Sequence, residues 1–352
     1  MSEIRHAMKH SPVISVLLPV RNGALYIDEA LRSIFAQTEQ DFEVIAVDDG
    51  SSDETPARLT EWAARDPRVV IMKLSGVGPA LALNAAISEA RGEYLARMDA
   101  DDVSHPGRFE AQIHLLVRQR DVGACGTWVR TFGVAGRHTW RHPATDFGIR
   151  ARLVFDSPLA HPSVMIRRDA VKDMNPIYRQ EFGRAEDYDL WERLGKTCKL
   201  ANVPRVFLNY RMHANQVTVA QNAASVAGAA LVRARILRNW WPTVTDRDLQ
   251  LHEQMCARAQ PATMEALAEM EAWLLRMGEY HQHHAFVPEQ VWRETLATKW
   301  WEVCRDSQAI GAKMLVRFIK SPLQRPTAIP ARRWLRLLAE TACHACKNRG
   351  AQ

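Results

Sequence analysis

The chain has 352 residues, of which 47% are apolar and 24% charged, as in a globular protein with room for one α/β domain and an additional region. No stretch reaches the roughly 18–20 consecutive apolar residues of a membrane-spanning helix, and the N-terminus lacks the apolar core of a secretory signal. The six cysteines have no disulfide-framework spacing, which is typical of a reducing compartment. We therefore expect a cytoplasmic protein.

The net charge of +6 is concentrated toward the C-terminus. Basic and acidic residues balance over residues 1–220, whereas residues 311–352 contain nine Lys or Arg and a single acid, Glu340. This asymmetry predicts an anionic partner for the C-terminal region. Nucleic acid is the poorer choice of partner, because no recognition motif is present and residues 1–220 have no charge surplus.

The first hundred residues alternate between strand and helix patterns. The predicted elements are a strand at 13–20, a helix at 25–37, a strand at 42–47, a helix from Thr55, a strand at 69–74, a helix at 78–90 and a strand at 94–98. Short connections between them predict right-handed βαβ units, and hence an α/β fold with a Rossmann-like, mostly parallel sheet covered by helices on both faces. Ligands bind such sheets at the carboxyl ends of the strands.

Beyond Asp102 the pattern changes. Helices and short strands mix as far as about residue 219, and the remaining sequence is helical and rich in Ala, Leu and Trp. We therefore expect an α/β domain at 1–220, followed by a helical, basic and Trp-rich region at 221–352.

An acidic cluster, Asp99-Ala100-Asp101-Asp102, directly follows the last predicted strand. Three carboxylates this close repel one another, and a hard divalent cation such as Mn²⁺ or Mg²⁺ would offset the repulsion while binding substrate phosphates. An EF-hand calcium loop is excluded, because Val103 and Ser104 stand where a ligand and a glycine are needed.

A dinucleotide site is an alternative at Gly76-Val77-Gly78, which follows a strand and opens a helix. Leu81 stands where the third glycine of that motif allows close helix packing, and Pro79 removes a backbone donor that phosphate would need. Both residues argue against this type of site.

Six segments follow one another in the chain: Val16–Asn22, the D-D-G-S-S-D turn at Asp48–Asp53, the D-x-D cluster at Asp99–Asp102, His161-Pro162-Ser163, the E-D-Y-D-L-W segment at Glu186–Trp191, and Tyr210-Arg211-Met212-His213. In these motifs and their order the chain resembles glycosyltransferase family 2, a large inverting family with the GT-A fold. Together these motifs span residues 13 to about 215.

The resemblance implies a nucleotide-sugar site in the first half of the chain. Asp48 would accept a hydrogen bond from the base of the donor nucleotide. The residues expected to border the donor are Pro19, Val20, Asn22, Asn84, Asp99, Ala100 and Arg211. Arg21 departs from the family pattern, which often has an aromatic residue there.

The resemblance also implies a metal and a base. Asp101, with Asp99 and Asp102, would hold Mn²⁺ or Mg²⁺ on the diphosphate, and His213 is a further candidate ligand. Asp187 would be the general base that deprotonates the acceptor hydroxyl, with Glu186 as the alternative. A single displacement of this kind inverts the anomeric carbon.

The basic C-terminal region offers two interpretations. Lys313–Lys320 and Arg332–Leu338 mix basic with apolar residues, which suits an amphipathic helix on the anionic inner face of a cell membrane and a lipid-linked saccharide acceptor. The alternative is a helical subdomain whose Trp and Leu side chains face its own core.

Two other functions are alternatives. A sugar-phosphate nucleotidyltransferase would need a phosphate loop rich in glycine and basic residues after the first strand, where Arg21-Asn22-Gly23 supplies only one basic residue and one glycine. A family member that binds a nucleotide-sugar without turnover would not need a base such as Asp187. We therefore expect a glycosyltransferase of cell-surface polysaccharide synthesis, using a UDP-sugar by default.

Overall fold

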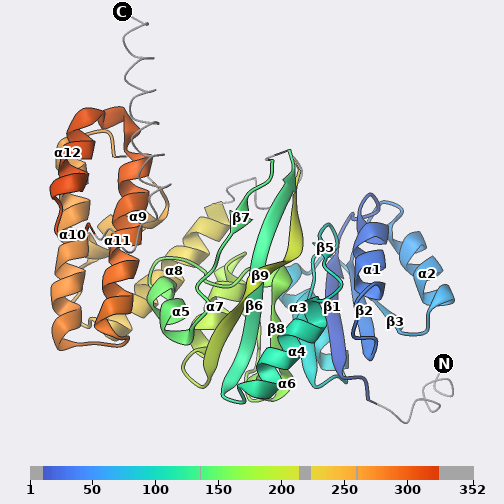
Figure 1. Ribbon diagram of the computed structural model, residues 1–352. Helices are drawn as coiled ribbons and strands as arrows, with labels where there is room; N and C mark the ends of the chain where they lie inside the picture. The colour runs from blue at the N-terminus through green and yellow to red at the C-terminus, as the bar shows by residue number, and fades with distance from the viewer. Residues whose placement is uncertain (1–10, 135, 214–222, 259–260, 325–352) are drawn as a thin grey trace, which may run out of the picture. The chain divides into compact units, whose positions relative to one another are not determined.

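The computed structural model describes residues 11–134, 136–213, 223–258 and 261–324 (Figure 1). The chain divides into two compact units: an α/β unit of residues 1–149 and 157–232, and a helical unit of residues 150–156 and 233–352. Two helices, α5 (Asp146–Leu153) and α8 (Ala223–Trp240), contain residues of both units. The domain boundary expected at residue 220 lies outside the described residues.

The α/β unit contains the strands and most of the shorter helices. Its strands are β1 (Ile14–Val20), β2 (Phe42–Asp49), β3 (Val69–Leu74), β4 (Tyr94–Arg97), β5 (Val103–Ser104), β6 (Val122–Gly133), β7 (Thr139–Trp140), β8 (Met165–Arg167) and β9 (Lys199–Met212). Its helices include α1 (Ile27–Phe35), α2 (Thr55–Arg65), α3 (Pro79–Glu89), α4 (Arg108–Arg118), α6 (Arg168–Val171) and α7 (Glu186–Leu194), with 3₁₀ turns at His161–Ser163 and Gln180–Phe182.

The described strands form one sheet in the order β3-β2-β1-β4-β8-β6-β9-β5, with β7 paired to β6. Strands β1 to β4 are parallel, as their short helical crossovers predicted. The other half is mixed, because β8 runs antiparallel to both β4 and β6 while β6 and β9 are parallel. The predicted α/β fold is confirmed, and its parallel character is strongest in the first hundred residues.

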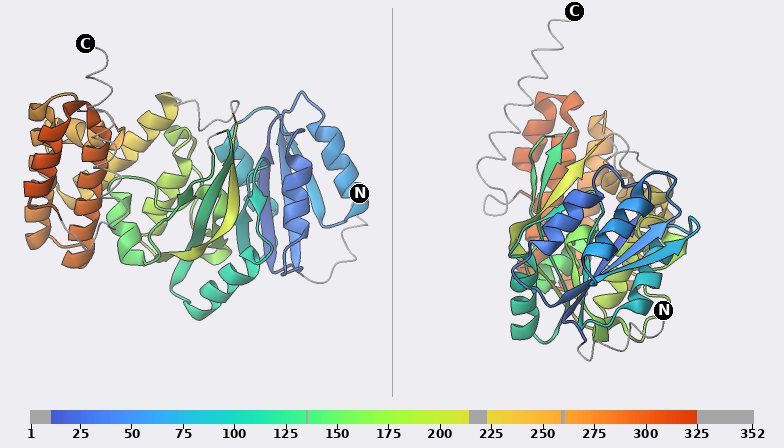
Figure 2. Two further views of the ribbon diagram at one scale, coloured as in Figure 1. Left: turned by 45° about the horizontal axis from the view of Figure 1, so that its top comes forward. Right: turned by 90° about the vertical axis from the view of Figure 1, so that its right-hand side faces the viewer.

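Alternate residues of β1 divide the core between the two faces of the sheet. Ile14, Val16 and Leu18 pack in one apolar cluster with α1 residues such as Leu31, because successive side chains of a strand point to opposite faces. The helix α3 contacts β1 and β2, and right-handed crossovers put it on the face opposite α1 and α2. Figures 1 and 2 show helices on both sides of these strands.

The strand order places a topological switch point between β1 and β4. The chain leaves β1 in one direction, toward β2 and β3, and returns through α3 to β4 on the other side of β1. The loops after β1 and β4 therefore diverge at the carboxyl edge, where open α/β sheets bind ligands. The loop after β4 contains the acidic cluster.

The helical unit is a bundle of α9 (Asp246–Cys256), α10 (Met264–His283), α11 (Glu289–Asp306) and α12 (Ala312–Lys320). Its core contains Trp273, Trp292 and Trp300, all nearly fully buried. Buried His252 binds the backbone oxygen of Val154 through Nε2 (2.9 Å) and receives the indole N–H of Trp273 at Nδ1 (3.2 Å). Tryptophan burial therefore holds this unit together.

The first basic amphipathic segment of the C-terminal region is α12. Met314 and Phe318 lie in the bundle core, and Arg317 pairs with buried Glu271. Val316 and Ile319 remain 53% exposed. The second segment, Arg332–Leu338, lies outside the described residues. None of the helices in the described ranges combines the length and apolarity needed to cross a membrane.

Candidate active site

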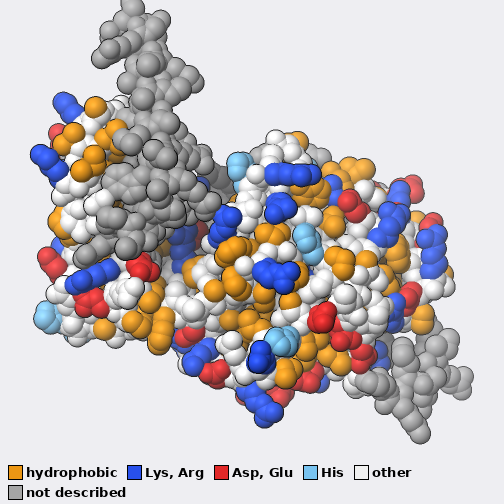
Figure 3. All heavy atoms as spheres, in the orientation of Figure 1, with side chains coloured by type: hydrophobic (Ala, Val, Ile, Leu, Met, Phe, Trp, Pro, Cys, Tyr) orange, Lys and Arg blue, Asp and Glu red, His pale blue; other side chains and the backbone are white. Residues whose placement is uncertain are grey.

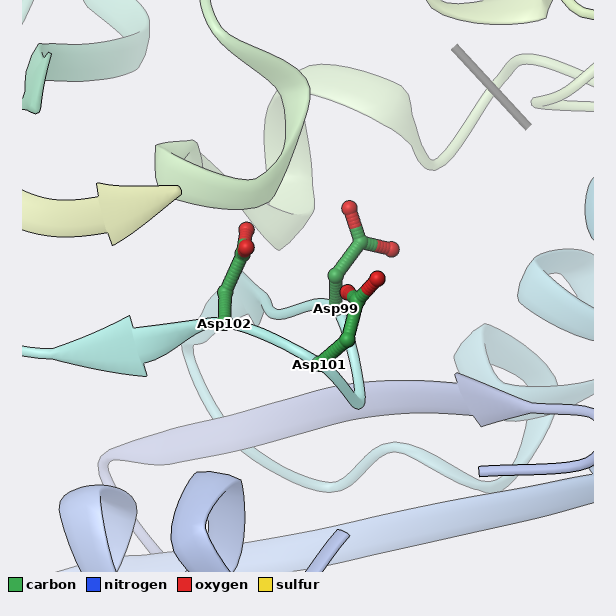
Figure 4. Close-up of side chains that lie close together, drawn as sticks. All are labelled: Asp99, Asp101 and Asp102. Atoms are coloured by element: carbon green, nitrogen blue, oxygen red, sulfur yellow. The ribbon is translucent and has the colours of Figure 1, made fainter. Parts of the chain in front are cut away.

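Three carboxylates converge in the turn after β4 (Figure 4). One ligand oxygen from each of Asp99, Asp101 and Asp102 can be chosen so that all three lie within 4.8 Å of one another. Asp102 is fully buried, and its Oδ2 has no hydrogen-bond partner among the described residues. Burial, followed by repulsion from Asp99, raises the pKa of Asp101 and raises that of Asp102 well above its ordinary value, with Asp101 adding to the repulsion on Asp102.

The acidic turn fits a hard divalent cation. It supplies only oxygen ligands, which Mg²⁺ and Mn²⁺ prefer, and its charge is incompletely compensated by the protein. His213 lies beside it, with Nε2 3.0 Å from Asp101 Oδ2. The structure thus brings the four predicted metal ligands into one neighbourhood.

Arg97, the last residue of β4, is a site residue that the sequence analysis missed. Its guanidinium is buried and lies 2.5 Å from Asp99 Oδ2. Burial alone would lower the pKa of Arg97, but Asp99, with Tyr178 and Asp102, outweighs burial and raises it. A basic residue in an otherwise apolar strand directly before an acidic cluster was the available signal.

Arg211, expected at the diphosphate, braces the acidic turn. Its backbone N–H donates to Asp102 Oδ1 (2.9 Å), and its Nε donates to the backbone oxygen of Asp101 (2.7 Å). Its guanidinium also pairs with Glu29 and lies 4.4 Å from the ring centre of Tyr26. Several of its donors are therefore engaged within the protein, and a direct diphosphate contact stays a prediction.

The loop after β1 is joined to the D-D-G-S-S-D turn after β2. Asn22 adopts a positive φ of 53°. Its N–H donates to Ser51 Oγ (2.9 Å), and its Oδ1 accepts the N–H of Ser52 (2.8 Å). Buried Asp48 accepts the N–H of Ser51 at Oδ1 (3.0 Å). These contacts hold the two predicted nucleotide loops side by side.

The same loop passes close to the acidic turn. Gly23 has so little room that an added Cβ would lie 2.6 Å from Val20 Cγ2 and 3.7 Å from Ala100 Cβ. Pro19 and Val20 close β1, whose register pairs Val20 with Asp48. The structure therefore gathers Pro19, Val20, Ala100 and Asp48 around the switch point.

The backbone N–H groups of the glycine loop after β3 already have partners within the protein. Asp49, buried at the end of β2, accepts the N–H groups of Val77 (2.7 Å) and Gly78 (2.8 Å). A dinucleotide site would need those donors for its pyrophosphate. This finding agrees with the sequence argument against such a site.

Asn84 has partners other than the predicted nucleotide. Its side-chain N–H donates to the backbone oxygen of Tyr178 (2.7 Å), and its Oδ1 accepts the N–H of Tyr178 (2.9 Å). The side-chain amide thus holds the Tyr178 loop, and a nucleotide contact of Asn84 stays a prediction.

The two candidate bases open helix α7. Glu186 is buried, its Oε2 has no hydrogen-bond partner in the described parts of the chain, and burial followed by the neighbouring Asp187 raises its pKa to about 7. Asp187 is half-buried and accepts a hydrogen bond from Ser157 Oγ at 3.3 Å. Asp187 is therefore the more accessible carboxylate of the pair.

Tyr178 connects the bases to the rest of the site. Its hydroxyl is 3.0 Å from His161 Nε2, in the H-P-S segment. Burial raises the pKa of Tyr178, Arg97 opposes the rise, and Asp187 and Glu186 add to it. Arg97 also opposes the rise in the pKa of Glu186. The acidic turn and the α7 carboxylates therefore share one electrostatic environment with Arg97.

Comparison with known proteins shows similarity to glycosyltransferases. Residues 15–174 match the family model described as glycosyl transferase family 2. The O-antigen biosynthesis glycosyltransferase WbnJ of Escherichia coli is 33% identical over 207 residues, which cover 57% of this chain and 80% of that protein. The putative glycosyltransferase EpsE of Bacillus subtilis is 32% identical over 53% of this chain and 68% of its own length.

A solved structure shows the same fold. TarS 1–349 of S. aureus, in complex with UDP-GlcNAc, has a TM-score of 0.56 at 17% identity, covering 84% of this chain and 90% of that one. The described sheet has the GT-A arrangement of that structure. With the family-model match and a relative 33% identical over 80% of its length, the chain belongs to glycosyltransferase family 2.

Proposed function

We propose that this glycosyltransferase is metal-dependent and inverting, and that it moves a sugar from a nucleoside-diphosphate sugar to an acceptor hydroxyl. The observation that supports this most strongly is the acidic turn at the switch point. Three carboxylates lie within 4.8 Å, one of them buried with an oxygen that lacks a partner among the described residues. A bound cation and diphosphate would supply the missing positive charge and ligands.

Asp99, Asp101 and Asp102 would hold Mn²⁺ or Mg²⁺, with His213 as a further ligand. The ion, when bound, would neutralise charge that develops on the departing nucleoside diphosphate. Arg97 would keep Asp99 in place, and Arg211 would fix the backbone of Asp101. Protein contacts thus orient the ligands before the donor arrives.

The donor would lie across the loops after β1, β2 and β4. Asp48 has one carboxylate oxygen engaged by Ser51, and the other would accept a hydrogen bond from the nucleotide base. Pro19, Val20, Asn22 and Ala100 would border the nucleotide and diphosphate. A UDP-sugar is the first donor to test, because the family resemblance implied it.

Asp187 would remove the proton from the acceptor hydroxyl as its oxygen attacks the anomeric carbon. The nucleoside diphosphate would leave from the opposite face, so one displacement inverts the configuration. Ser157 would orient Asp187 through its hydrogen bond. Buried Glu186 is the alternative base.

The acceptor would be a saccharide or lipid-linked saccharide of a cell-surface polysaccharide, as the similarity to an O-antigen enzyme suggests. The helical unit would be an acceptor-binding or membrane-surface region at the inner face of a cell membrane. The exposed Val316 and Ile319 of α12, with neighbouring Lys313 and Lys320, support an anionic lipid surface.

The deciding experiment is calorimetric titration of UDP, dTDP and GDP, each with and without Mn²⁺. We expect one nucleotide to bind only with the metal, and Asp101→Ala to lose that binding. A folded wild-type protein that binds none of the three would contradict the proposal. Metal-independent binding that persists in Asp101→Ala would contradict the metal site alone.

A further inference from the structure

A tight contact between α8 and the loop before α7 lies next to the candidate bases. Gly228, in α8, faces the backbone of Phe182. A Cβ added at Gly228 would lie 1.9 Å from the carbonyl oxygen of Phe182, 2.8 Å from its carbonyl carbon and 3.3 Å from Ala185 Cβ. No side chain can occupy that space unless the helix or the loop moves.

A second glycine meets α8 from the loop side. Gly183 has φ +59°, where L side chains are strained, and an added Cβ would lie 3.1 Å from the carbonyl oxygen of Ala224 in α8. Two glycines thus line the same contact, one on each side. Their lack of side chains lets the two backbones approach closely.

The loop in this contact leads directly into α7. The carbonyl of Phe182, which Gly228 faces, accepts the N–H of Ala185 (3.0 Å), and the carbonyl of Ala185 accepts the N–H of Asp189 (3.0 Å). Ala185 is the residue before Glu186 and Asp187, which form the first turn of the helix. A shift of Phe182 would therefore be passed through two consecutive backbone hydrogen bonds to the first turn of α7, which carries both carboxylates.

We propose that Gly228 is a positioning residue for the Glu186–Asp187 pair: its contact with Phe182 fixes where the first turn of α7 stands. This inference rests on the proposed catalytic role of that pair. Relieving a 1.9 Å contact requires a shift of an ångström or more. Misplacing a catalytic group by about 1 Å can cost on the order of 100-fold in rate.

The test compares Gly228→Ala with Gly278→Ala, a helical glycine in α10 whose added Cβ would meet Leu296 Cδ1 at an ordinary 3.4 Å. Hydrogen exchange of the intact protein should speed up in the peptide covering residues 180–190 for Gly228→Ala only. With the donor class found by the nucleotide titration, kcat for transfer should fall at least tenfold. The Kd of UDP with Mn²⁺, or of whichever nucleotide binds, should stay within threefold.

A second pair keeps the test decisive if Gly228→Ala folds poorly. Gly183→Ala presses on the same contact from the loop, and Gly311→Ala places alanine at a similar φ of +71° with nothing within 4 Å. Gly183→Ala should lower kcat more than Gly311→Ala does. If both glycines act through one loop, the double variant with Gly228→Ala should lose less than the product of the single losses.

The outcomes separate the two proposals. Faster exchange in residues 180–190 with unchanged kcat would overturn the positioning role, as would equal losses of kcat and nucleotide affinity. Unchanged exchange in both glycine variants would overturn the contact itself. A wild-type protein that transfers no sugar would count against the proposed function, while the exchange result would still decide whether Gly228 holds the loop.

Discussion

The acids of the candidate site differ from the buried acid Glu302 of the helical unit in how the protein compensates them. In the helical unit, Arg152 and Lys299 outweigh the effect of burial and lower the pKa of Glu302 to about 2. In the α/β unit, burial and like charges raise the pKa of Asp101 and Asp102, and that of Glu186 to about 7. The charge of Glu302 is thus compensated by basic residues of its own unit, whereas the site acids are compensated incompletely.

This contrast separates structural from functional charge. Raised carboxyl pKa values at the carboxyl edge of a sheet are typical of sites that a ligand completes. Figure 3 shows basic and acidic side chains interspersed over the visible face of the α/β unit, in keeping with the charge balance of residues 1–220. The uncompensated charge of the site is therefore not shared by the visible face of this unit.

The largest expected effect is on turnover. Asp187→Asn removes the proposed base at nearly constant shape, so kcat should fall by roughly 10²- to 10⁴-fold, the usual contribution of general-base catalysis. Nucleotide affinity in Mn²⁺, measured by calorimetry, should be unchanged. A variant that retains wild-type kcat while Glu186→Gln loses it would transfer the base role to Glu186.

Neutralising one acid in the site and one in the helical bundle should change stability in opposite directions. Asp102→Asn relieves repulsion in the acidic turn, so without divalent cations the free energy of unfolding should rise by about 1 kcal/mol. Glu271→Gln removes the charge that pairs with Arg317 at 2.6 Å in the bundle. The free energy of unfolding should fall by about 1–3 kcal/mol, because the Arg317 guanidinium loses its charged partner. Urea unfolding in EDTA measures both.

A matched binding measurement uses the same two variants. With Mn²⁺ present, Asp102→Asn should weaken nucleotide binding at least tenfold, and Glu271→Gln should leave it unchanged. If both variants destabilise the protein equally and neither affects binding, the contrast between the units does not hold.

The last effect concerns the pH dependence of stability. Glu186 has a folded pKa of about 7 against an ordinary 4.5, so the stability linked to its protonated form is fully present below pH 4.5 and is lost as pH rises through 7. At about 1.4 kcal/mol per pKa unit, a shift from 4.5 to about 7 corresponds to a loss of roughly 3 kcal/mol. Glu186→Gln should therefore gain stability relative to wild type between pH 5 and 8, as measured by thermal unfolding. A pH-independent difference would contradict the buried, uncompensated state of Glu186.

Much of the fold could be predicted from local sequence. Apolar runs bounded by Asn22-Gly23 and by the acidic turns gave the strands β1 to β4 and their helical crossovers, because strand burial and crossover handedness depend on short segments. The position of the acidic cluster at 99–102 could likewise be predicted, because it follows a strand whose carboxyl end lies at the ligand-binding edge of the sheet. The mixed half of the sheet was not, because β6, β8 and β9 pair across long intervals of chain.

Contacts between distant segments were decided only by the tertiary structure. The sequence could not show that Asn84 binds the backbone of Tyr178 or that Arg211 binds the acidic turn, and their predicted ligand contacts stay predictions. It gave no sign that Gly228 approaches Phe182, 46 positions earlier in the chain. Motifs record which chemical groups the chain contains, while packing determines which of those groups remain available to a ligand.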